Sequence, residues 1–528
     1  MKKTTRILTL LIVVIMLVSC FAACNDKNPN KNNTTPNNQN PQVTTPPNVD
    51  LGYELTPPRD LSVNGDPYTY RAYVRSDYAS SNPMEDGNPA FACIDFWIEE
   101  IGDNADALEY ATYQRNQEIE NAFNVRIRQV EQADNMVAEL RKFYQNNERY
   151  DLTIILAKSA AQAATQNLLK DLNSLETIDL THESYDQNSI KELSMGGKLY
   201  YLSGDMNTST MEVVAPTVVN LGMYEKYQQE ILSAFKGDEA YIDIYNIVLS
   251  KKWTMDTMLT IAQLAVVDAD TSDGVLNVKN GDTLGYFQYA ESTLYYFYGA
   301  GGRVTEINEE GYPEFVVNNN TNQDIFNYIY DHYNQTKVNW MPNGYSGPRK
   351  ENFFADACLF TDMTMWDIRA QLYFEEGLRY GVLPNPLFEE GNDYKALVHM
   401  YNTAHLWAIP SLANDDFKAQ VMMQALAEYS NVNKTDSTMD AYYNRTLYLN
   451  IAGPDTRARN IMKMIQNAMV YDIALLYDWG GWVKGLQEMD TKTTNEYAAL
   501  VSVMQATAYP KLEETIEAFK NPSALPSN

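Results

Sequence analysis

The chemical groups that stand out in this sequence are aromatic rings with a polar tip. The chain has 38 Tyr, 7 Trp and 17 Phe residues, so Tyr outnumbers Phe by more than two to one. Tyr and Trp combine an apolar ring with a hydrogen-bonding group. That combination suits sugars, because sugar C–H faces stack on rings while sugar hydroxyls need hydrogen bonds. Most of these rings are expected in the core or at its rim, and a few are expected to contact a ligand.

Candidate ligand-contacting residues follow segments that read as β-strands. In an open α/β sheet, the carboxyl ends of the strands face the ligand. The residues at such ends are Trp97, Glu99, Lys158, Ser159 and Asp205. Glu99 would accept hydrogen bonds from hydroxyls, and Asp205 would accept two as a carboxylate. The alternatives are a solvated charge for Glu99, an exposed loop pair for Lys158 and Ser159, and turn capping for Asp205.

No motif for catalysis or metal binding is complete. The acidic stretch Asp268–Asp282 differs from a calcium loop: with Gly274 at the sixth position, Ala269 and Asn280 take the first and twelfth, where acids are needed. The four histidines show no metal spacing, no CxxC pair exists, and NGYSG differs from the GxSxG of a nucleophile elbow. We therefore expect no metal, no cofactor and no catalytic residue. A glycosidase carboxylate pair would need geometry to identify.

Strand and helix patterns alternate along the chain, which predicts an α/β fold with a largely parallel sheet. Strands are expected where apolar residues alternate or run together, and helices where they recur every three to four residues. The predicted strands lie in 91–100, 125–131, 150–156, 197–205, 212–220, 311–317, 356–362, 378–386 and 405–415. The predicted helices lie in 104–124, 135–147, 159–169, 319–335 and 415–430, and the region after 430 is strongly helical.

The N-terminus predicts secretion and a lipid anchor. A basic start precedes the apolar run Ile7–Val18, which is shorter than the about 20 residues of a membrane span. The run leads into LVSC and FAAC, which resemble the bacterial lipobox, where the Cys becomes the lipidated first residue. Cys24 is favoured over Cys20, and an ordinary secretory signal is the alternative. The following Asn-, Pro- and Thr-rich residues, up to 65, predict a disordered tether.

Charge and cysteine usage exclude several classes of protein. Without the three basic residues of the signal, the chain has 37 basic and 69 acidic residues, a net charge near −32. That argues against binding nucleic acid, which needs a positive surface, and against direct binding to an anionic membrane. In the body from residue 66 onward, the cysteines are Cys93 and Cys358, both in apolar contexts. Two buried thiols are favoured over a disulfide between them.

Several segments, in their order along the chain, resemble the extracellular solute-binding lipoproteins of bacterial ABC importers. The similarity is to the sugar-binding group related to maltose-binding protein, and it covers nearly all of Ala90–Trp482. The resembling segments are RNQEIENAFNVRIRQVE, YDLTIILAKSAAQAATQNLLKDLNSL, GGKLYYLSGD, KWTMDTMLTIAQ, GAGGRVTEINEEGYPEFVVNN, RYGVLPNP and WAIPSLAND.

The resemblance implies a type II periplasmic-binding-protein-like fold, with two α/β lobes joined by hinge strands and a helical C-terminal region. It implies a signal peptide at 1–23, a tether at 24–65, lobe 1 at 66–215 plus 403–450, and lobe 2 at 216–402 plus 451–528. It also implies stacking aromatics at Trp366 and Trp479, each with a core position as the alternative. The expected role is capture of a solute, most plausibly a carbohydrate, outside the cell and its delivery to ABC permease subunits. The lobes close on the solute by a hinge motion.

Three other interpretations remain open at this stage. A surface-anchored glycoside hydrolase fits the anchor and the aromatic residues, and a helical starch-docking lipoprotein fits them too. The early alternation of strand and helix argues against the helical protein. Within the importer interpretation, the solute could also be a sugar derivative or a peptide.

Overall fold

The computed structural model describes residues 54–75, 96–102, 105–132, 136–206, 208–269, 276, 278, 281–288, 291–334, 339–340, 349–370, 377–401, 403–488 and 494–524. All of these belong to one compact unit, Leu51–Asn528. The predicted signal peptide, with Cys20 and Cys24, lies outside the described residues. Within the described residues, no helix is both long enough and apolar enough to span a membrane.

The first sheet is the core of lobe 1. Its strands are β1 (Tyr68–Arg75), β2 (Val125–Gln132), β3 (Leu152–Leu156) and β12 (His405–Ala408), in the order β12-β3-β1-β2. β1 pairs in parallel with β2 and β3, while β12 is antiparallel to β3. β3 is apolar almost throughout and nearly fully buried, as expected of a strand inside a parallel sheet. The buried strand ends at Leu156, where the chain leaves the sheet.

Helices cover the lobe 1 sheet, and their ends follow from local sequence. α3 (Ala107–Phe123) begins with a capping box between Asp106 and Glu109 and ends at Asn124, which has a left-handed backbone. The other helices of the lobe are α4 (Met136–Gln145), α5 (Ala157–Thr165), α6 (Gln187–Leu193) and α16 (Asp416–Ser430). Together with the strands they confirm the strand–helix alternation predicted for 125–169.

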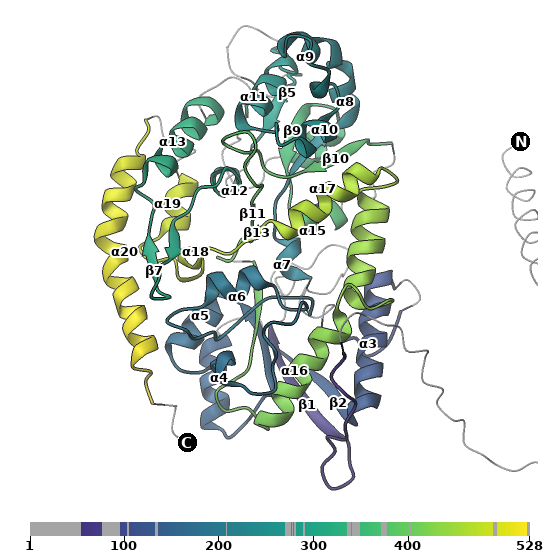
Figure 1. The fold of residues 1–528 in the computed structure, drawn as a ribbon, viewed down its shortest axis with the longest axis vertical. Coiled ribbons are helices and arrows are strands. Elements are labelled where there is room, and N and C mark those ends of the chain that lie inside the picture. The colour runs from purple at the N-terminus through teal and green to yellow at the C-terminus, as the bar shows by residue number, and fades with distance from the viewer. Residues whose placement is uncertain are drawn as a thin grey trace, which may run out of the picture. The chain divides into compact units, whose positions relative to one another are not determined.

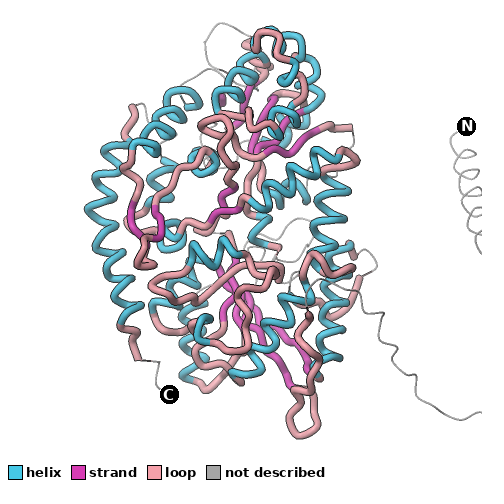
Figure 2. The backbone as a smooth tube through the Cα atoms, in the orientation of Figure 1, coloured by secondary structure: helices cyan, strands magenta, loops and turns pink. Residues whose placement is uncertain are grey.

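The second sheet is the core of lobe 2, and Figure 2 shows its strands as a group separate from those of lobe 1. Its order is β10-β4-β9-β5-β8, with parallel pairs around β5 and antiparallel pairs around β4. The strands are β4 (Thr217–Asn220), β5 (Leu284–Phe287), β8 (Asn339–Trp340), β9 (Cys358–Asp362) and β10 (Tyr380–Leu383). Small pairs join β6 (Thr305–Ile307) to β7 (Pro313–Phe315) and β11 (Ala396–Leu397) to β13 (Met469–Val470).

Lobe 2 is rich in short helices. They are α8 (Leu221–Lys226), α9 (Gln228–Ala234), α10 (Ile244–Leu249), α11 (Met255–Leu264), α12 (Ser292–Gly299), α13 (Asn320–Tyr328), α14 (Arg349–Phe354) and α15 (Met365–Ala370). Most start at an Asp, Asn or Thr whose side chain accepts a hydrogen bond from the first turn, such as Asn220, Thr254 and Asn319. The predicted strand–helix units at 311–335 and 356–369 are confirmed.

The chain passes between the lobes more than once. It leaves lobe 1 through α7 (Ser209–Glu212), returns after β11, and leaves again after α16 through η7 (Asp440–Ile451). The C-terminal helices are α17 (Thr456–Asn467), α18 (Ile473–Tyr477), α19 (Trp482–Glu488) and α20 (Tyr497–Lys520). α17 packs on α10, whereas α18 packs on α5, so this region contacts both lobes (Figure 1).

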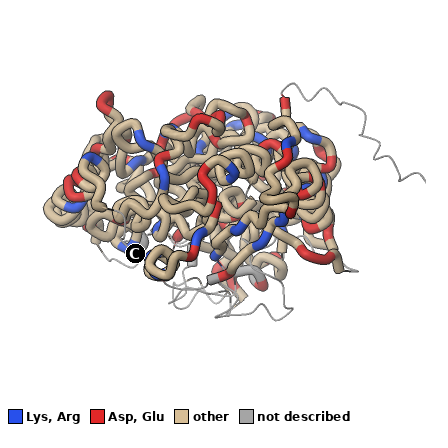
Figure 3. The backbone as a smooth tube through the Cα atoms, turned by 90° about the horizontal axis from the view of Figure 1, so that it is seen from below, with Lys and Arg blue, Asp and Glu red and all other residues tan. Residues whose placement is uncertain are grey.

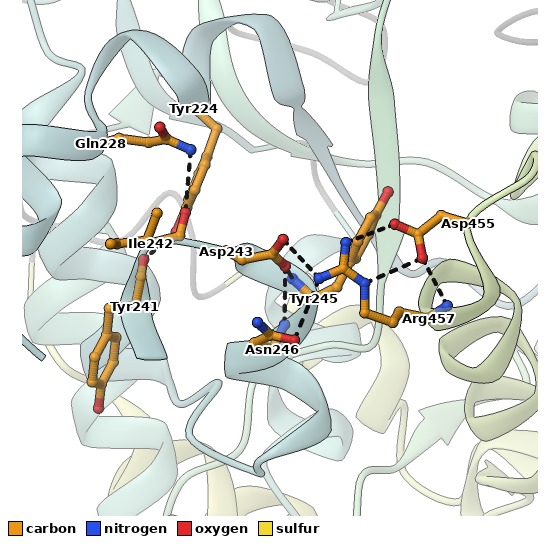
Figure 4. A network of polar contacts seen from close by, with 9 residues as sticks. All are labelled: Tyr224, Gln228, Tyr241, Ile242, Asp243, Tyr245, Asn246, Asp455 and Arg457. Atoms are coloured by element: carbon orange, nitrogen blue, oxygen red, sulfur yellow. Dashed lines mark hydrogen bonds and ion pairs between the residues drawn. The ribbon is translucent and has the colours of Figure 1, made fainter. Parts of the chain in front are cut away.

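An ion-pair network fixes α17 to lobe 2 (Figure 4). The Arg457 guanidinium lies 2.8 Å from a carboxylate oxygen of Asp243, before α10, and 2.8 Å from one of Asp455, before α17. Hydrogen bonds from Arg457 hold the pKa of the Asp455 carboxyl below its ordinary value. These side chains are about one third exposed, so the network fixes position more than it adds stability.

The structure corrects three sequence expectations. Residues 96–100, the described part of the strand predicted at 91–100, form no strand, and the first strand among the described residues is β1. Segment 197–205 makes only isolated bridges. The end of the predicted tether is wrong: Leu61 is 4% exposed and its N–H donates to the Phe123 carbonyl. Segment 268–282 is described only in part; within it the Asp282 carboxylate accepts a hydrogen bond from the Ala269 N–H, and the degenerate acidic loop stays a prediction.

Other predictions are tested only in part. Cys358 is buried in β9, while Cys93 lies outside the described residues, so their pairing stays a prediction. The residue boundaries predicted for the two lobes also stay a prediction.

Seen from below, acidic and basic positions are intermixed along the described chain, and this view shows no broad basic face, in keeping with the acidic composition (Figure 3).

Candidate functional site

The candidate site starts where β3 gives way to α5. β3 ends at Leu156 and α5 begins at Ala157, so Lys158 and Ser159 lie in the first turn of the helix. The Ala157 N–H donates to the Ala404 carbonyl, which ties this corner to the segment that returns from lobe 2. Lys158 and Ser159 are both half-buried, as residues at the carboxyl end of a buried strand should be.

A cavity of about 360 Å³ opens beside Lys158. Its walls come from α5, from the end of α18 with the turn after it, and from α20. The lining residues are Lys158, Ala161, Gln162, Thr165, Leu476, Tyr477, Trp479, Lys511, Glu514, Thr515 and Ala518. We call it the Lys158 cavity. Its mixture of aromatic rings, hydroxyls, an amide and opposite charges is suited to a polar, uncharged or weakly charged ligand.

Lys158 is held by an aromatic ring and lies near a carboxylate. Its Nζ lies 4.4 Å from the centre of the Tyr401 ring and 3.4 Å from the Tyr401 hydroxyl. Burial raises the pKa of the nearby Asp478 carboxyl, and the positive charges of Lys158 and Lys511 partly oppose that rise. Lys158 therefore has a fixed direction, and its remaining N–H groups can donate to a hydroxyl of a ligand.

Trp479 meets Lys158 in this cavity, but its ring faces are covered. The ring is 2% exposed, stacks on Tyr477 at 4.9 Å and meets Phe315 edge to face. Its Nε1 donates to the Thr515 hydroxyl over 2.9 Å. Trp479 thus forms part of the cavity wall, and stacking on a ligand would require Tyr477 to move away. Its role as a stacking residue stays a prediction.

Trp366 lies at a different strand end and does not line the Lys158 cavity. It is half-buried in the first turn of α15, which follows β9 directly. Arg369, one turn later in the same helix, forms a two-point ion pair with Glu212 of α7, at 2.6 and 3.2 Å. The Glu212 side chain is fully buried. This pair joins the helix that carries Trp366 to the segment that leaves lobe 1.

Trp97 and Glu99 lie away from the strand end where the sequence placed them. Both occupy an irregular segment before α3; Glu99 is exposed, and Trp97 is half-buried with the Arg128 guanidinium 5.7 Å from its ring centre. The residues that follow β1, 76–95, lie outside the described residues. A ligand role for Trp97 and Glu99 therefore stays a prediction without support from a strand end.

Asp205 has a different chemistry from the carboxylate expected. Burial raises its pKa to about 8, and the nearby acids Asp186 and Glu183 add to the rise. Its Oδ2 accepts a hydrogen bond from the Val432 N–H over 3.3 Å, and its own N–H donates to the Ser184 carbonyl. Asp205 is therefore mainly a neutral acid at pH 7, held within lobe 1 where the chain begins to leave it. Both of these contacts join Asp205 to segments distant in the sequence, so they are not turn capping, and its ligand role stays a prediction.

Sequence reasoning missed two residues that line the cavity, Lys511 and Glu514, and one that contacts Lys158, Tyr401. None carries a local motif: Tyr401 lies in a loop, and the other two lie on a helix rich in charge. The folding of α20 against α5 brings Lys511 and Glu514 to the cavity. Among the described residues, no group of three or more His, Cys, Asp or Glu side chains is arranged to hold a metal ion.

Comparison with solved structures identifies the fold. The chain matches the galacto-N-biose-/lacto-N-biose I-binding protein of an ABC transporter from Bifidobacterium longum, solved with lacto-N-biose, at a TM-score of 0.52 and 11% identity. The match covers 86% of this chain and 99% of the other. The chain has the two-lobed fold of ABC transporter substrate-binding proteins. The apo form of RafE from Streptococcus pneumoniae matches at a TM-score of 0.51 and 11% identity, over 85% of this chain and 99% of RafE. No family model and no curated protein sequence matches the chain.

The type II binding-protein fold predicted from the sequence is thus confirmed, as is its mixture of helix and sheet. At 11% identity the individual site residues cannot be transferred from either neighbour. The site therefore rests on the geometry of this chain: strand ends in two sheets, a cavity with mixed lining, and a lysine with a fixed direction.

Proposed function

We propose that this chain is an extracellular substrate-binding protein that captures a carbohydrate between its lobes and delivers it to an ABC transporter permease. It holds the sugar without changing it chemically. The observation that carries the proposal is the two-lobed fold shared, over 86% of the chain, with a protein solved in complex with lacto-N-biose. Two such lobes can close on a solute, and a permease can distinguish the closed form from the open one.

The described side chains support a hydroxylated ligand. The Lys158 cavity offers hydroxyl, amide and ammonium groups beside aromatic walls, and each can pair with a sugar hydroxyl. The half-buried Trp366 lies at the carboxyl end of β9, in the other lobe. A ring and a polar cavity at strand ends of different lobes would hold the two ends of an oligosaccharide better than one small sugar.

The membrane anchor is part of the proposal. LVSC and FAAC follow an apolar run and precede an Asn- and Pro-rich tether, an order that suits a lipid-anchored protein with its folded body held off the membrane. Anchoring through Cys24 would place the body on the outer face of the cell membrane, next to permease subunits. Residues 54–65 belong to the described body, so a tether would end before residue 54.

A thermal-shift screen tests the proposal. The body from residue 54 onward is screened against mono- and oligosaccharides, with amino acids and short peptides as controls. A sugar at about 100 times its Kd should stabilise the body by about 2.7 kcal/mol. The sugar is then recovered and its mass measured: unchanged sugar supports a binding protein, and cleaved sugar establishes a glycoside hydrolase instead.

Two variants make the screen specific to the site. Lys158→Met should remove about half of the shift or more, because it deletes the ammonium group at the cavity and a tenfold weaker Kd lowers the stabilisation to about 1.4 kcal/mol. Lys170→Met is the matched control, since Lys170 lies in the same lobe and pairs with Asp416 at 3.0 Å, outside the cavity. A shift produced only by peptides would leave the fold unaffected and overturn the sugar assignment.

A further inference from the structure

The C-terminal helix α20 is attached to both lobes. It is 24 residues long, and Figure 1 shows it running from beside α13 toward the C-terminus. It packs on α13 of lobe 2 and on α5 of lobe 1. A helix fixed to both lobes must bend, slide or detach at one end whenever the lobes rotate relative to each other.

The first half of α20 belongs to lobe 2. The Tyr497 hydroxyl donates to the Val317 carbonyl over 2.7 Å, and the Tyr497 ring stacks on Phe326 of α13 at 4.4 Å. Tyr509 meets Phe315 of β7 with ring centres 5.0 Å apart. These contacts hold the helix from its first turn to the residue before Pro510.

The second half of α20 belongs to lobe 1. The Lys198 ammonium donates to the Phe519 carbonyl over 2.7 Å, and the Phe519 ring meets Tyr200 edge to face at 5.0 Å. Just after the helix, the Asn167 side chain donates to the Ser523 carbonyl over 2.8 Å. All three lobe 1 residues follow β3 and precede the first crossing to lobe 2. The hairpin of β6 and β7 reaches the same corner, where Gly196 donates to Gly311.

Pro510 lies between the two halves, inside the helix. Proline has no N–H and its ring crowds the carbonyl four residues earlier, so it is the weakest point of a helix. Directly after it, Lys511, Glu514 and Thr515 line the Lys158 cavity. The helix therefore has its bending point beside the candidate ligand site, between an attachment to each lobe.

We propose that α20 is a strap that holds the two lobes in the arrangement that binds ligand, with Pro510 as its bending point. Because it concerns how the lobes close on a solute, the part of the proposal about affinity rests on the proposed function. If the lobe 1 end of the strap is freed, the lobes can adopt additional arrangements that do not bind the ligand. The apparent Kd then rises, because it equals the intrinsic Kd divided by the fraction of molecules in the binding arrangement.

A release variant tests the strap without touching the cavity. Lys198→Met removes the ammonium that holds Phe519, and Asn167→Gly removes the amide that holds Ser523 while tolerating the positive φ of 56° at that position. The matched control combines Lys170→Met with Asn147→Gly, the same substitutions elsewhere in lobe 1, at a residue with φ of 59°.

Amide hydrogen exchange of the full mature chain without ligand is the first readout. The strap predicts that exchange in residues 512–520 becomes at least tenfold faster in the release variant, while residues 497–508 and the control variant keep the wild-type rates. Equal rates in 512–520 of the release variant and the control would overturn the strap. This result does not depend on any sugar, so it stays decisive even if the proposed function fails.

The second readout is affinity for a sugar found in the screen, measured by titration calorimetry. The release variant should bind at least threefold more weakly than the control variant. A Kd within a factor of 1.5 of the control, together with faster exchange in 512–520, would overturn the link between strap and binding.

Pro510→Ala should have the opposite effect on hydrogen exchange, because it restores the missing backbone donor. Exchange rates around residues 506–514 should fall, and unchanged rates there would overturn Pro510 as the bending point.

Discussion

The ion pair between Glu212 and Arg369 should be essential to the position of α15. Glu212 is completely buried, and its two oxygens accept from two nitrogens of Arg369. Replacing Arg369 with Met would leave a carboxyl group in the interior without its cation. Removing one partner of a buried ion pair costs about 3–5 kcal/mol. For a lobe of this size, that corresponds to a fall in melting temperature of roughly 6–20 °C.

The pH dependence of this penalty separates lost charge from lost packing. Burial already raises the pKa of Glu212, and the Arg369 charge opposes the rise. Without Arg369, the pKa of Glu212 moves further up, so the folded variant takes up a proton that the unfolded chain releases. The penalty should therefore be largest near pH 8 and shrink as the pH falls toward 5. Thermal unfolding of wild type and Arg369→Met at several pH values measures it.

The control for this prediction is the double variant Glu212→Gln with Arg369→Met. It removes both charges, so it should be more stable than the single variant at pH 8 and should lack the extra pH dependence. A single variant that loses less than 1 kcal/mol at pH 8, or the same amount at every pH, would refute the assignment of Glu212 as a buried carboxylate neutralised by Arg369.

Four further outcomes can be measured. With the pKa of Asp205 at about 8, folding takes up a proton between about pH 4 and pH 8, so stability should fall as pH rises through that window; Asp205→Asn should remove this slope in chemical denaturation, and an unchanged slope would contradict it. Lys158→Met should raise the Kd for a sugar roughly ten- to hundredfold, since a hydrogen bond from a charged group contributes about 1.5–3 kcal/mol; calorimetry showing an unchanged Kd would remove Lys158 from the site. Arg457→Met should cost only about 1 kcal/mol, because the network is partly exposed, and a cost as large as that of Arg369→Met would contradict this ranking. Mass spectrometry of the mature N-terminus should find an acylated Cys24, and an unmodified terminus beyond that residue would exclude the lipid anchor.

Much of the fold could be predicted from the sequence, because the spacing of apolar residues indicates which side chains are buried. β3 is continuously apolar and β2 alternates, and both patterns follow from their places in a largely parallel sheet. β1 was missed although YTYRAYVR alternates, since its Tyr and Arg residues look polar while Tyr70 and Tyr73 are fully buried. Segment 197–205 has the composition of a strand but makes only isolated bridges, so the strand predicted from its composition is wrong.

The site was less predictable because it depends on contacts between distant segments. Lys158 was identified from its position after a strand, which is a local property. Trp479 was predicted to stack on a ligand, which stays a prediction, and its burial under Tyr477 depends on how the turn after α18 packs against α20. The raised pKa of Asp205 comes mainly from burial and also from Asp186 and Glu183, which lie about twenty residues earlier in the chain. No local pattern contains this information.

The most direct test of the account is calorimetric titration of the mature chain with the sugar that gives the largest thermal shift, followed by mass analysis of that sugar. We predict saturable one-to-one binding, a negative heat-capacity change, a Kd raised by Lys158→Met but unchanged by Lys170→Met, and sugar recovered intact. Binding that is equally strong in Lys158→Met would contradict the site, and sugar recovered as cleavage products would contradict the function.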